Sequence, residues 1–230
     1  MAYSVSEKSA LITAIPVFSG LPTDAVYRLA SDSITRRYSK GDIIFSEGDN
    51  ATGFYLLTEG RVKIFKISPD GKEQILHIFS PGNLFGEAAV FSGDSFPATA
   101  MALEKSRSLM IPKSSLKEVL LENPLLAMNM LAVLSSRLRH FSEIIENLSL
   151  KEVPGRLATY LVLLAGGGNQ VIHLDITRNQ LAAMLGTIPE TLSRILSKMM
   201  SQGIIDVNGR DIRVLDFSTL KALATGQKRL

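Results

Sequence analysis

The pattern of apolar and polar residues changes twice along the chain and divides it into three regions. Between residues 34 and 111, apolar and aromatic residues cluster in short runs that glycine-bearing turns interrupt, which is typical of β-strands. Strands at this spacing predict an all-β sandwich or roll. The predicted strands are residues 42–46, 53–58, 61–68, 72–79 and 98–111, the last broken near Glu104 and Lys105.

A long helix of about 25 residues is predicted next, because the apolar period changes from about two to about 3.5 residues. Asn123-Pro124 places a proline in its first turn, where the missing N–H costs little. From Ala127 onward, apolar residues recur in alternating steps of four and three, as in a coiled-coil seam: Leu131, Leu134, Leu138, Phe141, Ile145 and Leu148. The alternative is a helix packed on its own β domain, and Met128 and Met130 on flanking faces suit that alternative in part. We expect the uninterrupted seam to pair with a second copy in a parallel homodimer.

The C-terminal region has the pattern of a helix-turn-helix. Residues 177–180 (Thr-Arg-Asn-Gln) form a capping box that opens a short helix to Leu185, and Gly186 makes the turn. Residues 187–190 (Thr-Ile-Pro-Glu) form a second capping box, which begins a helix that ends near Ser201.

A helix over residues 153–165 precedes this motif, and a β-hairpin wing follows it. Residues 204–207 and 212–215 flank the dipeptide Asn208-Gly209, a strong hairpin signal. The sequence therefore predicts an α+β chain with a β-roll, a long dimerisation helix and a winged helix-turn-helix. The predicted domains are residues 1–122, 123–149 and 150–230.

Composition and charge exclude several classes of protein. The chain has no cysteine, so a disulfide framework, a thiolate nucleophile and a Cys-held iron–sulfur cluster are excluded. His77, His140 and His173 are too far apart in sequence to form a local metal motif. Residues 1–149 contain 15 Lys and Arg against 16 Asp and Glu, a net charge of −1, whereas residues 150–230 contain 10 against 6, a net charge of +4. The basic C-terminal part suits contact with a polyanion.

Neither a membrane protein nor an enzyme is expected. The N-terminus lacks the basic and apolar stretches of an export signal, and the most apolar stretch, residues 157–165, is too short to cross a bilayer. We expect a cytoplasmic protein. A cupin-like metal site needs clustered histidines, and only His77 lies in the β region. Residues 48–53 imitate the start of a P-loop, but Phe54 stands where lysine is required.

Candidate DNA-reading residues follow from the helix-turn-helix, whose second helix enters the major groove. Arg194 can donate to O6 and N7 of guanine, and Glu190 can accept from N4 of cytosine. The expected reading face is Pro189, Glu190, Ser193, Arg194 and Ser197. Phosphate contacts are expected from the start of the preceding helix, at Thr177, Arg178, Asn179 and Gln180. The alternative is that Glu190 only caps the helix and Arg194 only pairs with it.

Five motifs in order give the chain a family resemblance: Gly41-Asp42-Ile43-Ile44-Phe45, Glu47-Gly48-Asp49, Tyr55-Leu56-Leu57-Thr58-Glu59-Gly60, Phe85-Gly86-Glu87 and Glu190-Thr191-Leu192-Ser193-Arg194. With the seam helix, the chain resembles the CRP/FNR superfamily of bacterial transcription regulators over essentially its whole length. The resemblance implies a cyclic-nucleotide-binding-like roll, a homodimer bound to double-stranded DNA, and RNA polymerase as a partner. The E-x-x-S-R pattern resembles the FNR branch and implies a palindromic site like TTGAT-N4-ATCAA. Pro189 departs from better-known members, so the resemblance does not specify the outer base pairs.

The resemblance also implies an effector site in the roll, although not one for cyclic AMP. Gly86 and Glu87 match the pair that holds phosphate and ribose in the cyclic AMP branch. Pro97 stands where an arginine would neutralise the phosphate, and Phe141 aligns with an adenine-contacting threonine. The expected pocket is apolar, with a small effector held by Leu84, Phe85, Gly86, Glu87, Phe96, Pro97, Thr99, Leu134, Leu138 and Phe141.

Such a pocket could hold haem or a small apolar ligand. The family includes haem-based regulators of the nitric oxide or carbon monoxide response, and a hybrid-cluster-protein regulator subgroup that the chain resembles. His77 and His140 are the candidate axial ligands. A competing hypothesis is an effector-binding regulatory module without DNA-binding activity, which predicts no recognition face in the C-terminal region.

Overall fold

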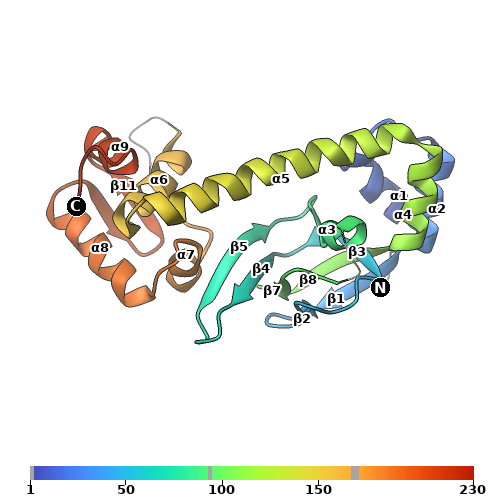
Figure 1. The fold of residues 1–230 in the computed structure, drawn as a ribbon, viewed down its shortest axis with the longest axis horizontal. Helices are drawn as coiled ribbons and strands as arrows, with labels where there is room; N and C mark the ends of the chain where they lie inside the picture. The colour runs from blue at the N-terminus through green and yellow to red at the C-terminus, as the bar shows by residue number, and fades with distance from the viewer. Residues whose placement is uncertain (1–2, 93–94, 167–170) are drawn as a thin grey trace. The chain divides into compact units, whose positions relative to one another are not determined.

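The computed structural model describes residues 3–92, 95–166 and 171–230 (Figure 1). Its internal contacts divide the chain into two compact units, Met1–Leu138 and Arg139–Leu230, and the boundary falls inside one long helix. The predicted domains 1–122, 123–149 and 150–230 were defined by changes of sequence pattern and not by contacts. They stay a prediction.

Two four-stranded antiparallel sheets form the roll of the first unit. One has the order β1 (Ile34–Tyr38), β8 (Ser106–Pro112), β3 (Gly53–Glu59) and β6 (Leu84–Phe85). The other has the order β2 (Ile43–Phe45), β7 (Thr99–Ala102), β4 (Val62–Ile67) and β5 (Glu73–Phe79). All five predicted runs form strands, and the expected break in the last run separates β7 from β8. The pattern did not single out β1 or the two-residue β6.

Strand β3 is buried on both faces, which explains its nearly continuous apolar sequence. Phe54 and Leu56 face a helical layer, whereas Tyr55 and Leu57 face the interior of the roll. The helical layer consists of α1 (Val5–Thr13), η1 (Pro16–Phe18), α2 (Thr23–Asp32) and α4 (Lys113–Glu122). It contributes the buried side chains Ile12, Phe18, Leu29 and Leu116. The sheet therefore separates two hydrophobic cores.

Helix α5 (Pro124–Leu150) has 27 residues and confirms the predicted long helix (Figure 1). Leu126 and Met130 bury its first turns in the helical core. The amide of Asn129 donates to the carbonyl oxygens of Val17 and Ser19, both at 3.1 Å. No single helix of the described residues is both long and apolar enough to span a membrane, and α4 with α5 passes that test only as a pair bent by 117°.

The second unit is a winged helix-turn-helix, as predicted. Its helices are α6 (Val153–Ala165), α7 (Arg178–Met184), α8 (Pro189–Ser201) and α9 (Phe217–Ala224). A three-stranded antiparallel sheet has the order β10 (Ile205–Asn208), β11 (Asp211–Val214) and β9 (Val171–His173). Strand β9 and helix α9 were not predicted. The turn between β10 and β11 requires the positive φ of Gly209, 62°.

Close packing of α6 on α9 builds the core beside the recognition motif. A Cβ atom at Gly155 would lie 3.2 Å from the carbonyl oxygen of Leu223, so a glycine lets the two helices approach. Leu157, Leu161 and Leu220 are fully buried at this contact.

The two predicted capping boxes have different outcomes. The first is confirmed, since the Thr177 hydroxyl accepts from the Gln180 amide at 3.2 Å and the Gln180 side chain accepts from the Thr177 amide at 2.8 Å. The second, at residues 187–190, is wrong. Ile188 is the N-cap and no side chain caps α8. Pro189, with its preset φ, takes the first helical position, which leaves Glu190 one position too early for a capping box.

Candidate DNA interface, helix seam and effector site

Helix α8 has one buried and one exposed face, which determines the side chains available to DNA. Its apolar residues Leu192, Ile195, Leu196 and Met199 are buried. Glu190, Arg194 and Ser197 are exposed, whereas Pro189 and Ser193 are partly buried. The predicted reading face is therefore the outward face of a helix fixed by its apolar side.

Glu190 neither caps α8 nor forms an ion pair with Arg194 in the described part of the chain. The alternative interpretation, in which Glu190 only caps the helix and Arg194 only pairs with Glu190, required these contacts. Their charged groups instead face solvent at the N-terminal half of the helix that enters the major groove in this motif. This arrangement favours a role in reading bases.

The start of α7 supplies a second set of polar groups. Thr177 and Gln180 use their side chains to cap the helix, whereas Arg178 and Asn179 are exposed and extend from its first turn. A cation and an amide at a helix N-terminus suit phosphate oxygens. Arg178 and Asn179 thus stay the predicted phosphate contacts, with Thr177 and Gln180 holding the helix end that presents them.

The wing adds one cation that the sequence analysis did not single out. Across its outward face, Asp206 lies opposite Arg213, and His173 Nδ1 lies 2.6 Å from Asp211 Oδ1. Arg210 lies at the tip of the wing, between β10 and β11, and is exposed. Lys198, exposed on α8, was missed likewise. Both belong to the basic C-terminal region, and that charge was the only available signal.

The predicted seam of α5 is exposed on the single chain. Leu131 is 56% exposed, Leu138 69% and Ile145 64%. Phe141 is also exposed, Leu134 is partly buried, and the side chain of Leu148 lies outside the described residues. Soluble proteins rarely leave so long an apolar row uncovered.

Aromatic rings fill the interior of the roll around the predicted effector site. Phe96 stacks on Phe45 with 3.7 Å between ring centroids and 10° between planes. The ring centroid of Tyr55 lies 5.6 Å from that of Phe45 and 5.1 Å from that of Phe85. Leu84, Phe85, Glu87 and Phe96 of the predicted site are buried, Gly86, Thr99 and Leu134 partly buried, and Pro97, Leu138 and Phe141 exposed.

Glu87 is almost completely buried and is paired with Arg137 of α5, a residue that the sequence analysis did not single out. Arg137 donates from Nη1 to Glu87 and from Nη2 to the carbonyl oxygen of Leu84, and its guanidinium lies 5.1 Å from the ring centroid of Phe79. The other carboxylate oxygen, Glu87 Oε2, is buried without a partner among the described groups. Burial lowers the pKa of Arg137 to about 10, which still leaves the guanidinium charged at neutral pH. Helix α5 is thus tied to the roll by an internal ion pair.

Replacing Arg137 with methionine is expected to lower the free energy of unfolding by about 3 to 5 kcal/mol, because a buried carboxylate loses its counter-ion. Urea unfolding measures this loss. Replacing Glu87 with glutamine as well removes the uncompensated charge, so the double variant should regain most of the stability.

Arg28→Met is the matched control for this prediction. It breaks another Arg–Glu pair, with Glu122, in which both side chains are substantially exposed, so water replaces the lost partner. The control should cost far less stability than Arg137→Met. Equal losses would show that burial of the Glu87 pair is unimportant.

The two candidate haem ligands lie in different units. His77, on β5, rests against Phe79 with 4.3 Å between ring centroids, whereas His140 is exposed on α5 beyond the unit boundary. The relative position of the two units is not determined, so the structure does not bring these histidines together. In the described residues no group of three or more His, Asp or Glu side chains is placed to hold a metal ion. Haem binding stays a hypothesis.

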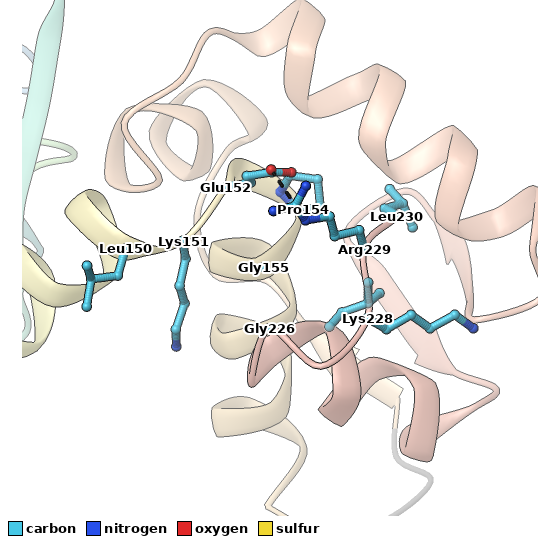
Figure 2. A pocket seen from close by; sticks show the side chains of 10 residues that line it. Leu150, Lys151, Glu152, Pro154, Gly155, Gly226, Lys228, Arg229 and Leu230 are labelled. Carbon is cyan, nitrogen blue, oxygen red and sulfur yellow. Dashed lines mark ion pairs between the residues drawn. The ribbon is translucent and has the colours of Figure 1, made fainter.

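A cavity of about 150 Å³ in the second unit, shown in Figure 2, lies at the start of α6. It is lined by Leu150, Lys151, Glu152, Pro154, Gly155, Leu223, Gly226, Lys228, Arg229 and Leu230. Arg229 reaches Glu152 at 3.9 Å, and Lys151 donates to the Thr159 hydroxyl at 2.9 Å. The first of these contacts links the last residues to the N-cap of α6.

A β-roll and a winged helix-turn-helix in one chain define a class of DNA-binding regulators. Residues 35–123 match the family described as "Cyclic nucleotide-binding domain", and residues 155–223 match "Crp-like helix-turn-helix domain". The chain belongs to the CRP/FNR family of transcription regulators and contains a DNA-binding helix-turn-helix. The hypothesis of an effector module without such a domain is therefore disfavoured.

Relatives support this assignment along most of the chain. The "Cyclic AMP receptor protein" of Thermus thermophilus is 31% identical over 211 residues, which cover 92% of this chain and 97% of that protein. The "Transcriptional activator protein Anr" of Pseudomonas protegens is 32% identical over 206 residues, covering 86% and 84%. The solved structure of FixK2 from Bradyrhizobium japonicum has a TM-score of 0.71 and 28% identity, covering 83% of this chain and 96% of that one. The homologues are transcription regulators.

Proposed function

We propose that the chain acts as a homodimer that binds a palindromic DNA site and regulates transcription in the cytoplasm with RNA polymerase as its partner. The observation that supports sequence-specific binding best is the outward face of α8, where Glu190 and Arg194 are exposed and not paired with each other. Arg194 would read guanine and Glu190 the N4 of cytosine. Arg178 and Asn179 would fix the register through phosphates.

The homodimer is supported by the exposed seam of α5. Knobs at Leu131, Leu138 and Ile145 would pack against the same residues of a parallel copy. Two-fold symmetry then places two recognition helices in successive major grooves, about 34–36 Å apart. A site like TTGAT-N4-ATCAA fits this requirement.

Cyclic AMP is not the proposed signal, although one relative is named for it. Pro97 gives the site no cation for a cyclic phosphate, and Arg137 is already paired with Glu87. A phosphate taken from water without a counter-ion is strongly disfavoured. The sequence suggests haem or another small apolar ligand as the effector in place of cyclic AMP.

Selection of duplexes from a random pool tests the proposed function. The purified protein is expected to enrich palindromes with half-sites about 10 base pairs apart and G·C pairs at the Arg194 positions. Cyclic AMP in the selection buffer should leave the enriched sequences unchanged. Enrichment of single half-sites, or no enrichment, would contradict the proposal.

A further inference from the structure

The two residues that the family resemblance assigns to an effector are both covered by groups of the same chain. A Cβ atom at Gly86, where φ is +79°, would lie 3.1 Å from Phe96 Cε1 and 3.3 Å from Phe45 Cε1. The backbone of Gly86 is therefore in contact with aromatic rings. One oxygen of the Glu87 carboxylate, Oε1, is bound by Arg137 from α5, and the other, Oε2, is buried without a partner among the described groups. Phe96 and Arg137 thus occupy the space and the charge that a ligand would need.

Phe96 is held in place by its own backbone. Its amide donates to the carbonyl oxygen of Asp49, and its carbonyl oxygen accepts from the amide of Gly48, both at 2.9 Å. The side chain is 4% exposed and stacks on Phe45. Because both backbone groups are bonded to the turn before β3, the ring is a fixed part of the core.

The rings behind Phe96 close the interior further. The ring centroid of Phe85 lies 6.2 Å from that of Phe45 and 5.9 Å from that of Phe79. A ligand that entered would have to expel a buried aromatic ring. Truncating a buried phenylalanine typically lowers the folding equilibrium constant by about two to three orders of magnitude.

We propose that Phe96 and Arg137 replace a diffusible effector at this site, so that the dimer binds its operator with no small molecule in the roll. This inference rests on the proposed function, and it specifies how that function is controlled. The Arg137–Glu87 pair supplies from within the chain a tie between α5 and the roll. Since α5 also displays the seam, the tie and the dimer surface share one helix.

Operator binding by protein freed of small molecules tests the inference. The full chain is unfolded in denaturant, desalted and refolded, and its binding to the selected operator is compared with that of natively purified protein. We expect equal affinities in the specific range, about 10⁻⁸ M or tighter at physiological salt. Cyclic AMP, cyclic GMP and haemin should each change the affinity by less than about threefold, a negligible coupling.

Tight binding by the native protein and only non-specific binding by the refolded protein would overturn the inference. A tenfold or larger gain with any of the three added compounds would also overturn it. If neither preparation distinguishes the operator from random DNA, the proposed function itself fails, which is a different result.

A cavity variant gives a second, independent test. Phe96→Ala, at constant dimer concentration, is expected to lower operator affinity at least about tenfold, and benzene, which binds engineered apolar cavities, should restore most of it. Phe54→Ala is the matched control, because Phe54 is also buried but lies in the helical core on the other face of the sheet. Its folded fraction should bind the operator normally. Wild-type affinity in Phe96→Ala, or the same loss in both variants, would count against the inference.

Discussion

Replacing Leu138 with glutamate is expected to convert the protein to monomers and reduce operator binding to the non-specific level. Leu138 is 69% exposed on the single chain, so the substitution leaves the core of the protomer intact. In the paired helices it would place two carboxylates against each other in a desolvated seam, and each buried leucine it removes is worth about 1.5 to 3 kcal/mol. The dissociation constant of the dimer should therefore rise at least about a thousandfold. Sedimentation velocity and operator binding by fluorescence anisotropy measure the two effects.

Leu163→Glu is the matched control for the seam. Leu163 is 77% exposed but lies on α6, outside the heptad row. This variant should sediment as a dimer and bind the operator like the wild type. A Leu138→Glu protein that remains dimeric at micromolar concentration would remove the basis for a coiled-coil interface.

Replacing Arg194 with alanine is expected to remove discrimination at one guanine in each half-site. A bidentate contact to guanine is worth about 1 to 3 kcal/mol, so affinity for the palindrome should fall about 5- to 150-fold for each half-site. Binding to random DNA should change much less, because the phosphate contacts proposed for Arg178 and Asn179 are not altered. Affinities for the selected operator and for its three base-pair variants at that position give the discrimination directly.

Lys198→Ala provides the contrast within the same helix. Lys198 is exposed on α8 but lies one turn beyond Arg194, where a cation suits phosphate. It should weaken binding nearly equally for all sequences and reduce the salt dependence by about one phosphate contact. If Arg194→Ala also weakens specific and random DNA equally, Arg194 does not read a base.

Local periodicity was enough to predict the main elements. The seam of α5 was recognisable because apolar residues recur in steps of four and three, and the strands of the roll because apolar runs end at glycine turns. Elements with weak local patterns were missed. Strand β6 has two residues and β9 has three, and each exists because a longer neighbour supplies its hydrogen-bond partners.

The second capping box shows how two local signals compete. Residues 187–190 have the required residue types, but the fixed φ of Pro189 places that residue first in the helix. The register moved by one residue, and Glu190 became exposed instead of capping. Because Glu190 does not cap the helix, its carboxylate is available for the proposed role in reading DNA.

By itself, the sequence determined the order of the main elements, the seam of α5 and the outward face of the recognition helix, since each follows from the spacing of residues along a single segment. Only the tertiary structure decided what occupies the site in the roll. Arg137 meets Glu87 across 50 residues of chain, and Phe96 meets Phe45 because β2 pairs with β7 and the segment before β7 bonds to residues 48 and 49. Such contacts depend on which strands and helices pack together, so no local pattern records them.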